Sequence, residues 1–452
     1  MRYPAIKEHI IISEQSGIII DLTTGKNIDL PAGAYPVLKL VDGQTDIDDI
    51  FREVSKTYKA SSDSFNNFFA NMFRLGFITI SPVPQKAPRE NKPPIRVASI
   101  EITEKCNLRC RYCYGAFAPD KSTSLNYEEA SNLFKALKER NVKTLELTGG
   151  EPLVNPDFDK ILDEACKQFD MVTIMTNAVV LHSTTLQIYK KHRNKIGFSI
   201  SIDGFSDETN DFQRGVHNTF QRTLNNIIRI KNDVEPHFLR VVYMLTNENI
   251  DEANKFFEHL LSHGIQNLMV SVPENVEKGR TYKLSDGCMM SDRKSKSRNM
   301  LEKKIMQLGE KYGRRINTII DRMGARGTRV ANAIPSCGAG WTMLSFQANG
   351  NVQPCNMMGS EWTLGNFKKD PQLNFLSHSN SLYTAFATIN LSAEDGNRDE
   401  CQYCEHNEFC GKCINKIFMA NKERLTQGKD FCPVILKMSF PKEIFQSRSQ
   451  NI

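Results

Sequence analysis

The sequence predicts an α/β protein with a partial (β/α)6 barrel in its middle. A winged-helix-like domain is predicted before the barrel and a cysteine-rich domain after it. Three observations support this division. Strand-like and helix-like segments alternate from residue 97 to about residue 320, which is typical of a parallel sheet. Shorter strand-like runs precede three helix-like segments in residues 1–82. Ten of the twelve cysteines fall into two groups, and the second group lies after residue 321.

The composition is that of a water-soluble globular protein. Of the 452 residues, 40% are hydrophobic and 24% are charged, and this length predicts about two to four domains. The net charge of +6 is too small for a protein that coats nucleic acid. The sequence lacks a run of about 18 apolar residues, and its first residues lack the apolar core of a signal peptide. We therefore expect a cytoplasmic protein with no nucleic-acid and no membrane partner.

Residues 1–82 are predicted to form a small domain of three strands and three helices. Strand-like runs alternate with turn-rich segments, as in GIIIDL followed by TTGK. Asp63 is placed to cap the third helix and Gly76 to end it. That helix carries an apolar stripe, assigned mainly to the domain's own core: Phe65, Phe68, Phe69, Met72 and Phe73. The order resembles a winged helix-turn-helix, but this helix lacks the Lys and Arg that DNA contacts require.

A linker is predicted at residues 83–96. This stretch holds four of the chain's 18 prolines together with several charged residues. Pro-rich polar segments are extended and semi-rigid. We therefore expect the linker to separate the first domain from the barrel.

The barrel is predicted at residues 97–320. Helix-like segments such as NYEEASNLFKALKERN separate six strand-like segments: RVASIEIT, TLELTGG, MVTIMTN, IGFSISIDG, FLRVVYMLT and NLMVSVP. Six strands are fewer than the eight of a closed barrel, so a partial barrel is expected. Polar motifs follow the first four strands, and in barrels the carboxyl ends of the strands hold the chemistry.

Three cysteines follow the first of these strands with the spacing C-x3-C-x2-C: Cys106, Cys110 and Cys113. In a reducing compartment such a group indicates metal or cofactor ligation rather than disulfides. Three thiolates are typical of a [4Fe–4S] cluster that lacks its fourth protein ligand. An incompletely coordinated metal leaves room for a small molecule. Taken alone, the motif is also compatible with a zinc or redox site.

The segment CNLRCRYC resembles the cysteine motif of the radical S-adenosylmethionine (SAM) superfamily, and GGEP at residues 149–152 resembles the family's second motif. The resemblance implies that SAM chelates the open iron and that one electron from the cluster cleaves it to a 5′-deoxyadenosyl radical. That radical takes a hydrogen atom from the substrate, while the protein orients the reactants and excludes water. With both motifs present one strand–helix unit apart, a zinc site becomes a minor alternative.

The same resemblance implies further contacts with SAM. Tyr112 is expected near the adenine. Arg214 is expected to bind the methionine carboxylate, since arginine binds carboxylates through two parallel hydrogen bonds. The second motif is expected to hold the methionine amino group, helped by the close backbone approach that glycine permits: Gly149, Gly150, Glu151 and Pro152. Three residues after the third and fourth strands match positions that face the cofactor: Asn177, Ser201 and Asp203. The sequence identifies no general acid or base.

The second cysteine group lies in a domain predicted at residues 321–452. Its spacing resembles the SPASM extension of radical SAM enzymes, which holds two auxiliary [4Fe–4S] clusters, so three clusters are expected in all. The family pattern implies two ligand sets, one of Cys337, Cys355 and Cys413 and one of Cys401, Cys404, Cys410 and Cys432. The interval between Cys410 and Cys413 is one residue shorter than in the family. Seven cysteines for eight sites leave the first set one ligand short, a position open to a substrate thiolate.

Cys166 and Cys288 stand outside both groups. Cys166 lies on the apolar face of a predicted helix and is expected to be a buried, inert thiol. Cys288, in the segment SDGCMMSD, is interpreted as a bystander, although it is one candidate for the missing cluster ligand.

Residues 1–82 also resemble the recognition element of enzymes that modify ribosomally synthesised peptides. Such elements bind a leader peptide as an added strand, here beside KNIDL and the third helix. The whole chain resembles thioether-forming sactipeptide and ranthipeptide maturases, supplied with electrons by an external donor such as flavodoxin or ferredoxin. The alternatives are another peptide-modifying radical enzyme, which forms a carbon–carbon crosslink or formylglycine, and a non-enzymatic, zinc-stabilised winged-helix regulator.

Overall fold

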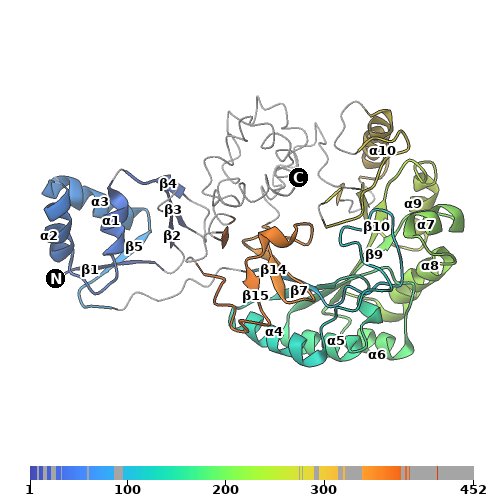
Figure 1. Ribbon diagram of the computed structural model, residues 1–452, viewed down its shortest axis with the longest axis horizontal. Coiled ribbons are helices and arrows are strands. Elements are labelled where there is room, and N and C mark those ends of the chain that lie inside the picture. The colour runs from blue at the N-terminus through green and yellow to red at the C-terminus, as the bar shows by residue number, and fades with distance from the viewer. Residues whose placement is uncertain are drawn as a thin grey trace.

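The computed structural model describes most of the chain up to residue 377 (Figure 1). The described residues are 1–7, 10–13, 18–21, 27–31, 33–58, 61–85, 95–273, 275–276, 278–289, 295–313, 319–320, 338–377, 382–383, 386 and 415. Cys355 is the only cysteine of the second group within these ranges; the other six lie outside the described residues, and so does most of the predicted linker.

The N-terminal region contains the predicted three strands and three helices. Strands β2 (Ile10–Ser13), β3 (Ile18–Asp21) and β4 (Asn27–Asp29) form an antiparallel sheet in that order, with β4 at one edge. The helices are α1 (Ala34–Lys39), α2 (Ile47–Thr57) and α3 (Ser62–Arg74). A second sheet pairs β5 (Ile78–Ser81) with β1 (Tyr3–Ile6), a strand that the sequence did not predict.

Helix α3 supplies much of the core of this region. Phe65, Phe69 and Met72 are buried, whereas Phe73 at the end of the apolar stripe is 55% exposed. The predicted cap was wrong by two positions, because the Ser61 side chain accepts the hydrogen bond from Ser64 N and Asp63 lies inside the first turn. The stripe therefore serves mainly the domain's own packing, as predicted.

Six parallel strands form the centre of the molecule, and their order in the sheet follows their order in the chain. They are β6 (Val97–Glu101), β7 (Thr144–Thr148), β8 (Met171–Thr176), β9 (Ile196–Ile202), β10 (Phe238–Met244) and β11 (Asn267–Ser271). All six were predicted. Strand β12 (Ile319–Ile320) extends the sheet beyond β11 in the parallel direction.

Helices connect the parallel strands and lie along the outer side of the sheet (Figure 1). The predicted helices are α4 (Tyr127–Glu139), α5 (Phe158–Gln168), α6 (Ser183–Lys191), α8 (Phe220–Arg229) and α9 (Ala253–Ser262). A π-helical turn, Ile230–Val234, continues α8. Two further helices were not predicted: α7 (Asp207–Arg214) and α10 (Lys296–Tyr312).

The barrel strands bury apolar side chains on their helix-facing side, and polar side chains are frequent among the alternating residues on the other side. In β9, Phe198 and Ile200 join the large apolar core, while the intervening Ser199 is buried away from that core. The same alternation in β6 separates Ile100 from Glu101. The inner side of the sheet therefore combines polar side chains such as Glu101 with apolar ones such as Met175 and Val242.

The chain adds three more strands at the β6 edge of the sheet. Strand β13 (Met343–Phe346) runs parallel to β6, and β14 (Asn351–Gln353) and β15 (Gly365–Asn366) follow antiparallel. A short 3₁₀ turn, Ser360–Trp362, lies between β14 and β15. This pairing places the region after residue 338 directly against the first barrel strand.

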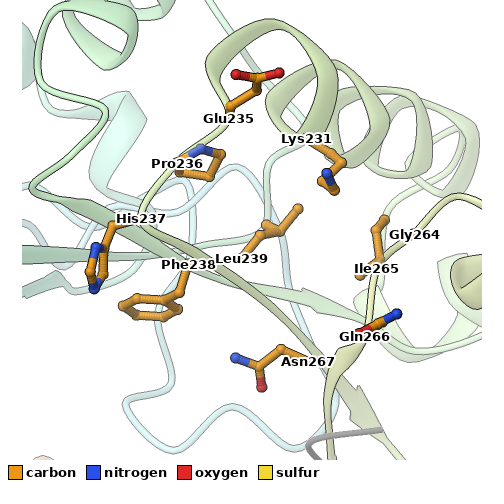
Figure 2. A pocket seen from close by; sticks show the side chains of 10 residues that line it. All are labelled: Lys231, Glu235, Pro236, His237, Phe238, Leu239, Gly264, Ile265, Gln266 and Asn267. Atoms are coloured by element: carbon orange, nitrogen blue, oxygen red, sulfur yellow. The ribbon is translucent and has the colours of Figure 1, made fainter. Parts of the chain in front are cut away.

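A cavity of about 410 Å³ opens near the starts of β10 and β11 (Figure 2). Phe238 and Asn267, the first residues of these strands, line it together with Lys231 and Ile265. Because these are the amino ends of the strands, the cavity is not where a barrel holds its chemistry. Within the described residues, every helix falls short of the length and apolar character needed to cross a membrane.

Candidate active site

The three clustered cysteines lie on the loop between β6 and α4, at the carboxyl end of the sheet. Cys106 is buried among Leu108, Phe117 and Val179, with Cys110 and Cys113 packed against this group. The loop has little regular structure of its own, so other elements must hold it in shape.

Two elements far along the chain fix the backbone of the cysteine loop. The amide N–H groups of Arg109 and Arg111 donate to the carbonyls at the end of α7, each at 3.0 Å. From the segment after β11, the Arg280 guanidinium donates to Cys110 O at 2.6 Å and Phe117 O at 2.7 Å. The amide of Arg280 donates to Cys113 O at 2.9 Å. The loop is therefore held from both sides.

Hydrogen-bond donors surround the sulfur atoms. The amide of Leu108 lies 3.4 Å from Cys106 Sγ, and Arg214 Nη1 lies 3.8 Å from Cys110 Sγ. Burial raises the pKa of Cys106 well above its ordinary value and raises that of Cys110 to about 11, although the Arg214 charge opposes the second shift. A cysteine binds a metal as the thiolate, so bound iron would offset this rise in pKa, and the three clustered thiols fit iron ligation.

The GGEP motif packs directly against the cysteine loop. Gly150 N donates to Thr103 O at 2.7 Å, and Glu151 N donates to Lys105 O at 2.9 Å. A Cβ atom on Gly149 would lie 2.3 Å from Thr103 O, and one on Gly150 would lie 2.3 Å from Lys105 O. Gly149 also has a φ of +136°, which favours glycine. The glycines therefore permit a close approach between two loops of this chain.

Glu151, which follows β7, forms hydrogen bonds with residues at the end of β8. Its carboxylate accepts hydrogen bonds from Asn177 N at 2.7 Å, from Thr176 Oγ1 at 2.7 Å and from Leu153 N at 3.1 Å. Burial raises the pKa of Glu151, and these donors oppose the shift. Pro152 begins the 3₁₀ turn Pro152–Val154. Asn177 places its amide nitrogen 4.0 Å from Cys106 Sγ.

Asp203 and Arg214 form a buried ion pair beside the cysteines. Arg214 Nε lies 2.5 Å from Asp203 Oδ2, and the Tyr112 hydroxyl donates to the same carboxylate. Burial raises the pKa of Asp203 to about 6, and Arg214 opposes this rise. Arg214 Nη2 is buried and makes no hydrogen bond within the described part of the chain. A buried donor of this kind is positioned for a ligand carboxylate, so the residues present fit SAM.

The structure thus brings together most of the predicted site residues at the ends of β6 to β9. Tyr112 uses its hydroxyl on Asp203, and its ring packs edge-on against Tyr282 with centroids 6.2 Å apart. Ser201 is half-buried on the inner side of β9, next to Val242 of β10. Direct contact of these residues with SAM stays a prediction.

Several residues that shape the site were not predicted, among them Glu101, Gln213, Lys278 and Arg280. Glu101 had a signal in the sequence, because the alternation in ASIEIT places it on the polar side of the first strand. The segment that carries Lys278 and Arg280 has no periodic pattern. Only the folded structure shows that it crosses the cysteine loop.

Cys355, at the end of β14, is the described member of the second cysteine group. The Met357 amide lies 3.4 Å from its sulfur. Cys166 is buried on α5, as predicted, and burial raises its pKa to about 12. Cys288 is partly buried, with its amide bonded to Asp286 at 3.2 Å.

Comparison with known families identifies two domains in the chain. Residues 100–260 match the Radical SAM superfamily, and residues 337–413 match SPASM, an iron–sulfur cluster-binding domain. The chain therefore carries a radical SAM domain and a SPASM region. It is an enzyme of radical chemistry, and its cofactors are SAM and [4Fe–4S] clusters, as predicted.

Two curated relatives come from Bacillus subtilis strain 168. The antilisterial bacteriocin subtilosin biosynthesis protein AlbA is 24% identical over 443 residues, which cover 93% of this chain and 94% of the relative. The sporulation killing factor maturation protein SkfB is 24% identical over 273 residues, 60% of this chain and 62% of the relative.

Among solved structures, Streptococcus suis SuiB bound to its precursor peptide SuiA has a similar fold. It has a TM-score of 0.54 and 17% identity, and the match covers 93% of this chain and 97% of SuiB. The similarity supports the predicted α/β architecture.

Proposed function

We propose that the protein installs thioether crosslinks, from cysteine sulfur to carbon, in a ribosomally synthesised precursor peptide. The main support is the sequence match to AlbA, a bacteriocin biosynthesis protein. This match extends over nearly the whole of both chains. A match confined to the barrel would support only the radical chemistry. SkfB, named as a maturation protein for a killing factor, supports the same class of substrate.

Residues 1–82 are proposed to bind the leader of that precursor. Strand β4 forms one edge of its sheet, so its outer backbone groups can pair with an added strand. Main-chain hydrogen bonds would supply affinity, and side chains of the sheet and of α3 would select the sequence. The isolated leader should therefore bind the protein as well as the full precursor does.

Within the barrel, this chain's residues hold and orient the cofactors. Cys106, Cys110 and Cys113 would ligate the cluster, and the buried Arg214 Nη2 would bind the methionine carboxylate of SAM. When bound, cluster and SAM together supply a 5′-deoxyadenosyl radical that removes a hydrogen atom from the substrate. The glycines and Glu151 keep the cofactor loops in register. Packed side chains and loops at the strand ends limit the entry of water.

An external one-electron donor, such as flavodoxin or ferredoxin, is part of this proposal. The first cluster must be reduced before SAM can be cleaved. A cytoplasmic location is also proposed, because clustered cysteine ligands persist in a reducing compartment.

The test is anaerobic incubation with a precursor peptide encoded beside the gene, SAM and a reductant. Each thioether should lower the peptide mass by ~2 Da, because two hydrogens leave. It should also remove one cysteine from reaction with an alkylating agent. A mass loss with all thiols retained would instead show a carbon–carbon crosslink. Zinc-containing, colourless protein that leaves SAM intact would overturn the enzymatic proposal.

A further inference from the structure

Glu101 occupies a distinctive position in the barrel. It is the last residue of β6, lies on the inner side of the sheet and is 2% exposed. Its partner in the register of the neighbouring strand is Thr148, the last residue of β7. It therefore lies at the carboxyl ends of the strands, in the layer where barrel enzymes place their reactive groups.

The other fully buried carboxylates of the described chain already have hydrogen-bond donors for their oxygens. Each accepts at least three hydrogen bonds or ion pairs: Glu151 from β8 and its own turn, Asp203 from Arg214, Tyr112 and Met244 N, and Asp211 from Thr219 and Phe220. Glu101 differs, because its donors within the described residues are the side chains of Lys278 and Tyr114 rather than backbone N–H groups. Its oxygens thus retain capacity for a donor that a ligand brings.

Lys278 is the one cation that contacts Glu101 in the described residues. Its Nζ lies 3.4 Å from Glu101 Oε1, and its side chain is 21% exposed. Lys278 follows β11 whereas Glu101 ends β6, so the pair joins the first and last of the six barrel strands across the mouth of the barrel. Burial raises the pKa of Glu101, and the Lys278 charge opposes that rise.

Tyr114, the residue after Cys113, lies beside this ion pair. The Tyr114 hydroxyl is buried, and its interaction with Glu101 opposes the rise in the pKa of that carboxyl. The ammonium of Lys278 lies 5.4 Å from the Tyr114 ring centre. Besides Lys278 and Tyr114, Glu104 is the other charged group that acts on Glu101.

We propose that Glu101 accepts the proton of the substrate cysteine thiol as the sulfur–carbon bond forms, with Lys278 as the residue that positions the carboxylate. This inference rests on the proposed thioether function. One S–H and one C–H bond break, and one S–C bond forms. The hydrogen atom of the carbon goes to the deoxyadenosyl radical, one electron goes to an oxidised auxiliary [4Fe–4S] cluster, and the proton goes to Glu101.

The first test compares Glu101→Gln with the matched surface variant Glu139→Gln, which lies exposed on α4. Loss of a general base should slow crosslinking by ~10²-fold or more. Release of 5′-deoxyadenosine should continue, because Glu101 takes no part in making the radical. Glu101→Asp should recover part of the crosslinking rate. Circular dichroism and iron content check that each variant folds and carries its clusters.

The second test measures the protonation of the Glu101 carboxyl group directly, in protein that is not turning over substrate. Infrared spectra of protein containing ¹³C-labelled glutamate should show an acid band that titrates in the wild type and is missing from Glu101→Gln. Lys278→Met removes the opposing charge, so this band should persist to higher pH. The pH at which crosslinking sets in should shift upward in the same variant, because the base works only when it is ionised.

The outcomes distinguish a failure of the proposed thioether function from a failure of the role assigned to Glu101. If the wild type cleaves SAM but crosslinks no precursor, the thioether function fails. If the wild type crosslinks and Glu101→Gln does so at the same rate, the assignment of Glu101 fails alone. An infrared titration that Lys278→Met leaves unchanged would contradict the role of Lys278.

Discussion

Arg214 joins three parts of the site through a single side chain. Its guanidinium bonds Asp203 through Nε, approaches Cys110 Sγ through Nη1 and keeps Nη2 without a partner in the described residues. The planar guanidinium group can donate hydrogen bonds in these three directions at once, whereas the ammonium group of a lysine cannot. Burial of Asp203 would be costly without it, since an unpaired buried charge destabilises a fold by about 3–5 kcal/mol.

Replacing Arg214 by Lys should therefore weaken SAM binding while it keeps a positive charge near Asp203. The loss of a charged hydrogen bond is worth about 1.5–3 kcal/mol, or roughly a 10- to 100-fold rise in Kd. Equilibrium dialysis of the reconstituted protein measures the change, with the exposed Arg222→Lys as control. Unchanged affinity in a variant with full iron content would remove Arg214 from the SAM site.

Gly149→Ala should disturb the cysteine loop, since the added Cβ would lie 2.3 Å from Thr103 O. Gly264→Ala is the matched control, because Gly264 also has a positive φ, +72°, but has no atom within 4 Å of its Cβ position. The control should cost only about 1 kcal/mol of backbone strain. We expect Gly149→Ala alone to lose iron from the first cluster. Equal iron contents in both variants would contradict the packing role of Gly149.

Site residues with a motif were predictable, and residues without one were not. The cysteine triplet and GGEP each combine fixed spacing with a place after a strand, so their meeting at one end of the sheet follows from a parallel arrangement. Lys278 and Arg280 reach the site from an irregular segment more than 160 residues beyond Cys113. Neither periodicity nor spacing specifies such a contact.

Helix α4 is tied to the region after residue 338 at its C-terminal end. Arg140, the C-cap residue, is largely buried and donates to Leu373 O at 2.7 Å, Gln372 O at 3.3 Å and Leu376 O at 3.4 Å. This contact joins the barrel to the segment that follows β15. It supports the element that carries Cys355 into position beside β6.

Arg140→Met should loosen this junction, because methionine keeps an apolar stem but leaves the carbonyls without these donors. The cost should be about 1–3 kcal/mol, concentrated in residues 370–377. Hydrogen exchange followed by mass spectrometry measures it, with the exposed Lys135→Met on the same helix as control. Protection of residues 370–377 that is equal in the two variants would contradict the role of Arg140.

Helix α9 carries a histidine whose protonation the fold opposes. The His259 ring packs 5.2 Å from Phe205 and 4.5 Å from His263, and its Nε2 is buried without a partner among the described residues. Burial, followed by the His263 charge, lowers the pKa of His259. Its contribution to stability is therefore complete above the unfolded pKa of about 6.5 and is lost as the pH falls below that value.

His259→Phe should make the free energy of unfolding less dependent on pH. Between about pH 7 and pH 5 the free energy of unfolding should fall more steeply in the wild type than in the variant, because the unfolded wild type binds a proton that the folded state resists. Anaerobic denaturant titrations at both ends of this range measure the difference. The exposed His217→Gln should behave like the wild type. A variant as acid-sensitive as the wild type would show that His259 is not the titrating group.

Elements with a strong periodic pattern were predictable, and short or irregular ones were not. All six barrel strands and five of their helices were predicted because each has a continuous apolar face. Helix α7 is short and polar, with Asn210 and Gln213 buried, so it shows no apolar stripe. Strand β1 contains Pro4 and is stabilised by its pairing with β5, more than 70 residues away. Both elements therefore depend on tertiary contacts, which a local sequence pattern does not reveal.

At the scale of the molecule, the partial barrel is bridged by contacts rather than by strand pairing. The ion pair between Lys278 and Glu101 and the hydrogen bonds from Arg280 join the segment after β11 to β6 and its loop. On the other side of β6, strand β13 adds the region of Cys355 to the same sheet. Both cysteine regions therefore converge on β6, which brings radical formation close to the proposed site of sulfur–carbon bond formation.

The most direct test of this account is electron paramagnetic resonance of the reduced protein with and without SAM. The wild type should show a [4Fe–4S] signal whose shape changes when SAM binds, because SAM fills the open position on one iron. A variant with Cys106, Cys110 and Cys113 all replaced by Ala should lose about four of about twelve iron atoms, and its remaining signal should ignore SAM. A wild-type signal that SAM leaves unchanged would contradict the central claim that these three cysteines hold the cluster that binds SAM.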